Sequence, residues 1–231
     1  MSILECKDLC KNYGAAHALE KVNFQIESGH IVGFLGPNGS GKSTLIKIAN
    51  GLLTPSSGQL LIDGKTPGAE TKKIVSYLPD RACLCSWMTP SQLLDFYEDF
   101  YPDFQRSAAE EMLANLNIPA KLRIKQMSKG TQEKLQLILV MSRKARLYLL
   151  DEPIGGVDPA TRDYILHTII SSFHPEAAIV LCTHLIADVE SILDDVLFIN
   201  QGRIVLQACT DDIRQERGQS VDTLFREVFK C

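Results

Sequence analysis

The fold of this chain is decided by the stretch Gly36-Pro37-Asn38-Gly39-Ser40-Gly41-Lys42-Ser43-Thr44. The stretch matches the pattern G-x-x-x-x-G-K-[ST], in which glycines let backbone N–H groups turn inward around phosphate oxygens. The preceding apolar run, Ile31 to Leu35, predicts a strand buried on both faces, and a helix is expected to start near Ser43. A strand, a glycine-rich loop and a helix in this order predict a nucleotide phosphate site.

Several groups of this loop have expected roles toward a nucleotide. The following helix presents the positive end of its dipole to the phosphates. Lys42 adds positive charge at the β- and γ-phosphates and is a candidate catalytic residue, while the Ser43 hydroxyl is a candidate Mg²⁺ ligand. The predicted ATP-binding residues of the loop are Gly36, Pro37, Asn38, Gly39, Ser40, Gly41, Lys42, Ser43 and Thr44.

Two carboxylates follow a second apolar run. The run Leu147 to Leu150 predicts a buried strand, and Asp151 and Glu152 come directly after it. In α/β folds the carboxyl end of such a strand lies beside the phosphate loop. Asp151 is therefore a candidate Mg²⁺ ligand, and Glu152 is the candidate base that accepts a proton from an attacking water. Without the phosphate loop upstream, Asp151 and Glu152 would be interpreted as the solvated end of a strand.

The middle of the chain has a different pattern from its two ends. From about Ser91 to Ala145 the apolar residues recur at helical spacing, and Pro102 and Pro119 separate the helices. This pattern predicts a helical lobe, at about residues 84–145, that is inserted between strands.

Strand signals occur on both sides of this lobe, and α/β alternation returns after it. The expected strands are Ile3 to Leu9, Val22 to Ile26, Ala178 to Cys182, and a hairpin of Val196 to Ile199 with Arg203 to Gln207. The expected helices start at Asp158-Pro159, span Leu185 to Leu193, and span Val221 to Phe229. Asp158 is an expected N-cap, because an Asp followed by Pro is typical of a helix start.

Composition and charge restrict the function classes. The chain has 231 residues, of which 45% are hydrophobic, and a formal net charge of -4. It is long enough for a sizeable core and lacks the basic footprint of a general nucleic-acid binder. No apolar stretch approaches the roughly 20 residues that span a bilayer, and the N-terminus lacks the form of a signal peptide. We therefore expect a cytoplasmic chain without a nucleic-acid partner, which acts on a membrane through another protein.

Further motifs follow one another in the order of a known family. The segment Met127 to Gln132 reads M-S-K-G-T-Q and resembles the ABC signature L-S-G-G-Q. The other matches are Tyr13 for the ring that stacks on adenine, Tyr77 to Asp80 for the Q-loop, Gly155 to Asp158 for the D-loop, and Thr183-His184 for the switch histidine. The chain resembles an ATP-binding cassette (ABC) subunit over essentially its whole length.

This resemblance implies both a fold and an activity. The implied fold is α/β: one domain over residues 1–231, with a P-loop NTPase core, a mixed sheet, an N-terminal antiparallel β subdomain and an inserted helical subdomain. The implied activity is ATP hydrolysis by a short, exporter-type subunit of an ABC membrane transporter. Such a subunit energises separate permease subunits and lies in the cytoplasm, against the inner face of the cell membrane.

The resemblance also implies roles for residues outside the phosphate loop. Two cassettes pack head to tail, and each ATP lies between the phosphate loop of one and the signature of the other. Ser128 and Gly130 are then expected to bind the γ-phosphate of the partner's nucleotide, where a helix N-terminus suits an anion. His184 is expected to contact the γ-phosphate as a catalytic residue. Asp158, in the D-loop match, is expected to bind the nucleotide.

Some of these positions keep a second interpretation. Tyr13 also fits an ordinary strand-end aromatic residue, and His184 a core histidine. Asp80 stands where the family has glutamine, so it is a candidate nucleotide and Mg²⁺ ligand or a residue that closes a turn after Pro79. Lys129 replaces a signature glycine, and its charge lies near the partner's nucleotide or points to solvent.

The segment after the Q-loop match, from Ala82 to Met88, has two interpretations. In the family this region forms the groove that receives a helix of the permease. Trp87, the single tryptophan, and Met88 are suitable anchors for a partner helix. Both also suit the core of the helical lobe.

Two other function classes compete with a transporter subunit. A soluble ABC-type ATPase outside transport, acting on ribosomes or DNA, would typically carry two cassettes or long coiled-coil inserts, and neither is evident in the sequence. A P-loop kinase of small molecules would lack the signature motif. The sequence favours the transporter subunit.

Overall fold

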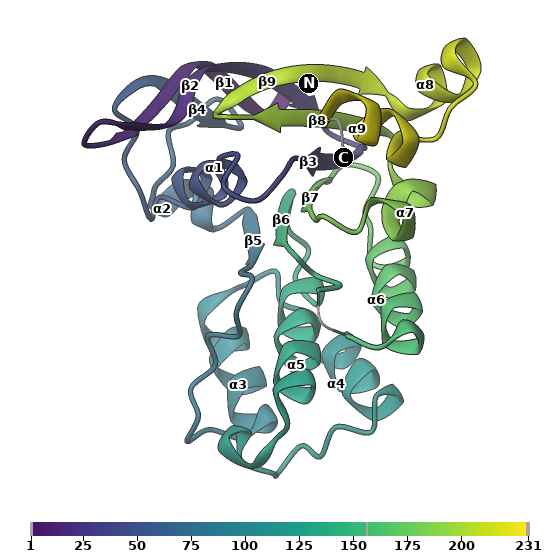
Figure 1. Ribbon diagram of the computed structural model, residues 1–231. Helices are drawn as coiled ribbons and strands as arrows, with labels where there is room; N and C mark the ends of the chain where they lie inside the picture. The colour runs from purple at the N-terminus through teal and green to yellow at the C-terminus, as the bar shows by residue number, and fades with distance from the viewer. Residues whose placement is uncertain (1, 156, 230–231) are drawn as a thin grey trace.

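The computed structural model describes residues 2–155 and 157–229, and Figure 1 shows how their strands and helices are arranged. The strands are β1 (Ser2–Tyr13), β2 (Ala16–Glu27), β3 (Ile31–Leu35), β4 (Ser57–Ile62), β5 (Val75–Leu78), β6 (Leu147–Asp151), β7 (Ala178–Cys182), β8 (Asp195–Asn200) and β9 (Arg203–Cys209). The α-helices are α1 (Lys42–Ala49), α2 (Ala69–Lys72), α3 (Pro90–Phe100), α4 (Arg106–Asn115), α5 (Lys129–Met141), α6 (Pro159–Ser171), α7 (Ile186–Val189), α8 (Thr210–Arg217) and α9 (Val221–Phe229). Two 3₁₀ helices are η1 (Ile124–Gln126) and η2 (Glu190–Ile192). The α/β class is confirmed.

The larger sheet brings the ends of several strands to one edge. Its strand order is β5-β6-β7-β3-β8-β9, with parallel pairs from β5 to β8 and an antiparallel pair between β8 and β9. Every residue of β3, β6 and β7 is buried, which explains their continuous apolar sequences. Because parallel strands end at the same edge, the segments that follow β3, β6 and β7 meet there.

The smaller sheet is antiparallel and has the order β2-β1-β4. Its apolar face shares one core with α1 and with one face of the larger sheet, where Leu4 and Val22 join Leu45 and Phe34. In Figure 1, α1 lies beside β3, between these sheets. The two N-terminal strands expected from the sequence are confirmed and are longer than expected, so the antiparallel N-terminal part of the fold is confirmed as well.

The helices α3, α4 and α5 lie between β5 and β6 in the chain, within the stretch where the sequence predicts helices. They have a core of their own, which includes Leu94, Ala109 and Leu135. Figure 1 shows them extending away from the two sheets. Pro102 and Pro119 both lie outside these helices, as their missing N–H groups require.

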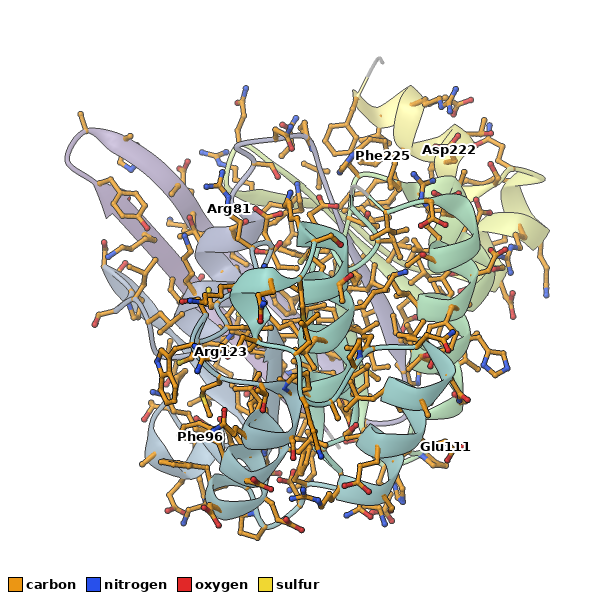
Figure 2. The ribbon with its side chains drawn as sticks, turned by 90° about the horizontal axis from the view of Figure 1, so that it is seen from below. Arg81, Phe96, Glu111, Arg123, Asp222 and Phe225 are labelled. Carbon is orange, nitrogen blue, oxygen red and sulfur yellow. The ribbon has the colours of Figure 1, made fainter. Side chains whose placement is uncertain are left out.

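The C-terminal elements differ in one place from the expectation. The helix expected over Leu185 to Leu193 is α7 followed by the 3₁₀ helix η2. The Glu190 carboxylate in η2 accepts hydrogen bonds of 2.9 and 3.3 Å from the N–H groups of Val221 and Asp222, at the start of α9. Phe225 of α9, labelled in Figure 2, packs on Phe198 of β8 with ring centroids 5.4 Å apart. The tail helix is therefore fixed to the sheet. Among the described residues, no helix has the length and apolar character to cross a membrane.

Candidate active site

The phosphate-binding pattern forms the connection between β3 and α1. Gly41 precedes the first residue of α1 and has φ 115°, a conformation that favours glycine. A Cβ atom at Gly41 would lie 2.6 Å from the carbonyl oxygen of Ala18. A Cβ atom at Gly36 would clash with the carbonyl oxygen of Ile199. The loop therefore needs glycine at both positions, because neighbouring backbone lies against it.

Lys42 lies over this loop with its side chain largely buried. Its Nζ donates hydrogen bonds of 2.6 Å to the carbonyl oxygen of Gly36 and 3.1 Å to that of Pro37. The ammonium group thus stands at the mouth of the loop, held by backbone carbonyls. A lysine in this position is suited to bind an anion such as a phosphate.

Asp151, the last residue of β6, is a buried carboxylic acid beside the loop. Burial raises its pKa because the charged form loses hydration, and the negative charges of Asp80 and Glu152 raise it further. A hydrogen bond with Ser43 and the charge of Lys42 act in the opposite direction. The predicted metal ligands Ser43, Asp80 and Asp151 are therefore close to one another.

Glu152 follows Asp151 at the end of β6 and turns its carboxylate toward β7. It has φ 53°, an uncommon conformation for a residue with a side chain. Its N–H donates a 2.8 Å hydrogen bond to the carbonyl oxygen of Cys182. The Thr183 hydroxyl donates a 3.1 Å hydrogen bond to Oε2, and His184 Nδ1 lies 3.0 Å from both carboxylate oxygens. The carboxylate is therefore oriented by the segment after β7.

These groups surround one cavity of about 350 Å³. Its lining residues are Ala18, Asn38, Gly39, Gly41, Lys42, Ser43, Thr44, Asp80, Asp151, Glu152 and His184. A cavity with a glycine loop and a lysine on one side and carboxylates on the other suits a nucleoside triphosphate whose γ-phosphate faces a general base.

Known proteins match the chain in this region and beyond it. A family model described as ABC transporter matches residues 19–155. The ABC transporter ATP-binding protein YxlF of Bacillus subtilis is 30% identical over 227 residues, which cover 96% of this chain and 76% of YxlF. The chain belongs to the ABC transporter family. It is an ATP-binding, ATP-hydrolysing subunit of an ABC transporter, a class of subunit that acts with permease subunits and pairs with a second cassette.

Two other ABC proteins extend the comparison. The SkfA peptide export ATP-binding protein SkfE of Bacillus subtilis is 28% identical over 211 residues, covering 89% of this chain and 88% of SkfE. A solved structure, described as an ATP-binding subunit of an ABC transporter, has a TM-score of 0.87 and 30% identity. The match covers 99% of this chain and 100% of the chain in the solved structure. The likeness to ABC cassettes therefore extends over the whole fold.

Four residues that the ABC resemblance predicts as nucleotide contacts do not line the cavity: Tyr13, Ser128, Gly130 and Asp158. Tyr13, the last residue of β1, is half exposed, with Lys11 Nζ 5.3 Å from its ring centroid. Ser128 caps α5, and its hydroxyl accepts a 3.2 Å hydrogen bond from the N–H of Thr131. Gly130 lies in the exposed first turn of α5, with nothing within 4 Å of an added Cβ. One cassette alone does not bring the signature residues to its own phosphate loop.

The D-loop match is described only in part. Asp158 caps α6 by accepting hydrogen bonds from the N–H of Thr161 at 3.1 Å and from its hydroxyl at 2.7 Å. These hydrogen bonds hold the pKa of Asp158 below its usual value. The expected helix start is therefore confirmed. Gly156, in the middle of the motif, lies outside the described residues.

The positions with a second interpretation now have defined surroundings. The Lys129 side chain is 87% exposed and lies 3.4 Å from Glu133, so it points to solvent in this structure. Met88 belongs to the core of the helical segment, which favours the core interpretation for Met88. Trp87 is exposed.

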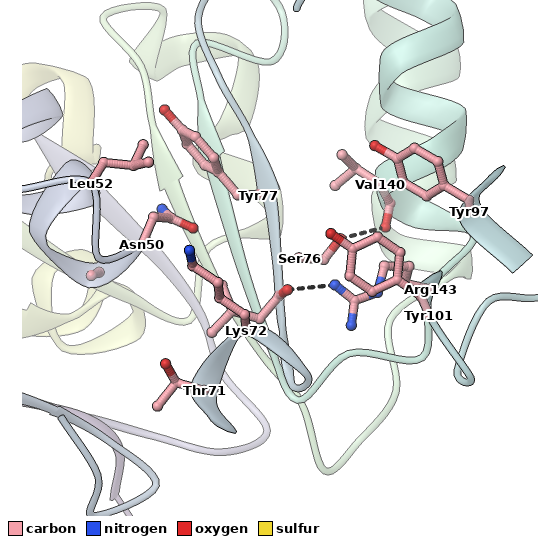
Figure 3. Close-up of a pocket in the computed structure, with 12 residues that line it drawn as sticks. Asn50, Leu52, Thr71, Lys72, Ser76, Tyr77, Tyr97, Tyr101, Val140 and Arg143 are labelled. Carbon is pink, nitrogen blue, oxygen red and sulfur yellow. Dashed lines mark hydrogen bonds between the residues drawn. The ribbon is translucent and has the colours of Figure 1, made fainter. Parts of the chain in front are cut away.

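A second cavity, of about 260 Å³, lies between the core and the helical segment and is shown in Figure 3. Leu52, Lys72 and Tyr77 lie on its core side, and Tyr97 and Tyr101 come from the helical side. Leu52 is 59% exposed. This cavity could not be predicted from the sequence, because its walls come from segments far apart in the chain.

Proposed function

We propose that Glu152 is the general base of ATP hydrolysis in this cassette. The observation that carries this assignment is the position of its carboxylate, which lines the phosphate-loop cavity and has two donors, Thr183 and His184, behind it. A water oxygen bonds to the γ-phosphorus while the bond from that phosphorus to the β–γ bridging oxygen breaks. ADP leaves with the electron pair, and a proton of the water passes to Glu152.

We assign Mg²⁺ to the oxygen atoms of Ser43, Asp151 and Asp80. The buried Asp151 carboxyl, hydrogen-bonded to Ser43, fits a hard cation that prefers oxygen ligands. Within the described residues no three acidic, His or Cys side chains converge as a metal site. That agrees with Mg²⁺ rather than with a tightly caged metal, because Mg²⁺ is usually held by one or two carboxylates together with substrate phosphates. When bound, the cation neutralises charge on the phosphates.

We assign Lys42 and His184 to binding the γ-phosphate of ATP. The loop residues Gly36 to Thr44 are assigned to binding its phosphate chain. Tyr13 is assigned to the adenine ring, on the family pattern. Ser128, Gly130 and Asp158 are assigned to the second cassette's nucleotide. The exposed N-terminus of α5 supports this assignment, because a helix N-terminus with free N–H groups attracts an anion.

We further propose that residues 1–231 are one ABC domain, with residues of about 84–145 as its helical subdomain. The separate core of α3, α4 and α5 supports this division. Permease subunits would hold the cassette against the inner face of the cell membrane, and the cavity of Figure 3 would receive a permease segment. Export is the proposed direction, since SkfE is described as a peptide export protein.

Affinity purification from detergent-solubilised membranes of the native cell tests this proposal. We expect a permease to co-purify with the tagged chain, and the complex to hydrolyse ATP only when Mg²⁺ is present. Recovery of an active ATPase from the soluble fraction, with no membrane protein attached, would favour an ABC-type ATPase that is not engaged in transport.

A further inference from the structure

Thr183 is a buried residue whose hydroxyl lies between two partners. It follows β7, and its relative exposure is 0%. The hydroxyl oxygen lies 3.1 Å from Glu152 Oε2 and 3.1 Å from the N–H of Leu185. Since the N–H of Leu185 can only donate, the oxygen accepts there and its single hydrogen is directed to Glu152. The Thr183 hydroxyl therefore accepts a hydrogen bond from Leu185 and donates one to Glu152.

The backbone fixes this hydrogen bond from both sides. Asp151 of β6 pairs with Cys182 of β7, so Glu152 and Thr183 are adjacent where the two strands end. The N–H of Glu152 also donates to the carbonyl oxygen of Cys182. His184, by contrast, has a side chain that is 59% exposed. The buried hydroxyl is therefore the more rigid of the two donors to the carboxylate.

We propose that Thr183 is a positioning residue for ATP hydrolysis, whose hydroxyl holds the Glu152 carboxylate toward the phosphate-loop cavity. This inference rests on the proposed role of Glu152 as the base. By bonding Oε2, the hydroxyl keeps the carboxylate oriented while Glu152 stays in its uncommon backbone conformation.

Three variants separate positioning from a structural role. Thr183→Val keeps the shape and removes the donor, while Thr183→Ser keeps the donor. For the valine variant we expect kcat to fall on the order of tenfold to a hundredfold, less than the roughly hundredfold to ten-thousandfold that general acid–base catalysis contributes, because the base itself is still present. KM for ATP should change by less than about twofold, and serine should restore kcat. Thr168→Val is the matched control, because its buried hydroxyl bonds to the Tyr164 carbonyl oxygen within α6.

The results distinguish the inference from the proposal on which it rests. An unchanged kcat in Thr183→Val, alongside an inactive Glu152→Gln, would overturn the role of Thr183 alone. Full turnover by Glu152→Gln would instead remove the assigned base. If the valine variant does not fold, Thr183→Cys decides in its place: its weaker donor should give a kcat below that of the serine variant, and a wild-type kcat would overturn the inference.

Discussion

The side-chain oxygen of Gln136, buried in α5, accepts a hydrogen bond of 2.7 Å from the N–H of Cys83. Gln136 stands between apolar neighbours on the helix that begins beside Ser128, and Cys83 follows shortly after Asp80. One hydrogen bond thus connects the helix of the signature motif to the segment that enters the nucleotide cavity.

Gln136→Leu tests how much the hydrogen bond between Gln136 and Cys83 contributes to stability. The leucine fits the apolar helix face but leaves the Cys83 N–H without its partner, and an unpaired N–H costs about 1–3 kcal/mol. We expect the free energy of unfolding in urea to fall by that amount, and amide hydrogen exchange at Cys83 to become faster. The exposed Gln59→Leu in β4 serves as the control. Unchanged exchange at Cys83 would mean that the hydrogen bond does not hold the segment.

The pKa of Asp151 predicts a pH dependence of stability. Its pKa is raised above the ordinary value of 3.8, so the folded chain holds this proton more tightly than the unfolded chain. Ionised Asp151 therefore destabilises the fold, and the penalty grows as pH rises from 3.8 to the folded pKa, then stays constant.

Asp151→Asn removes that penalty. Without Mg²⁺ we expect the variant to melt at a higher temperature than the wild type at pH 7, with the difference shrinking as pH falls toward 3.8. The variant should also lose Mg²⁺-dependent turnover. Melting curves over this pH range check the prediction, and a variant less stable than the wild type at pH 7 would contradict it.

Leu52 tests the proposed permease contact. Leu52→Glu places a charge on an exposed apolar side chain of the cavity in Figure 3, away from the phosphate loop. We expect the purified variant to hydrolyse ATP at the wild-type rate and to lose the co-purifying permease. Val205→Glu, at an exposed position of β9, is the matched control and should retain the permease. Retention by both variants would place the contact elsewhere.

Much of the catalytic half of the fold could be predicted from local sequence. The phosphate loop lies between the apolar β3 and α1, as expected, because glycine spacing and a continuous apolar run are strong local signals. Asp158 caps its helix as expected for the same reason. By contrast, β4 and β5 were missed as strands, since β4 is half exposed and β5 has only four residues.

The hydrogen bonds of the site depended on strand order, which no single segment specifies. Thr183 could be placed before the switch histidine, but its hydrogen bond to Glu152 follows from β6 and β7 being neighbours. The contact from Gln136 had one signal in the sequence, a polar residue inside an apolar run. Its partner could not be inferred, because 53 residues separate it from Cys83.

The most direct test of the account follows the fate of bound ATP during a single turnover. Wild-type cassette and Glu152→Gln are each mixed, in the permease complex with Mg²⁺, with less than one equivalent of γ-labelled ATP, and phosphate release is followed over time. The account predicts that both bind ATP with similar affinity and that only the wild type releases labelled phosphate. Release at the wild-type rate from Glu152→Gln would show that another group takes the proton from the water.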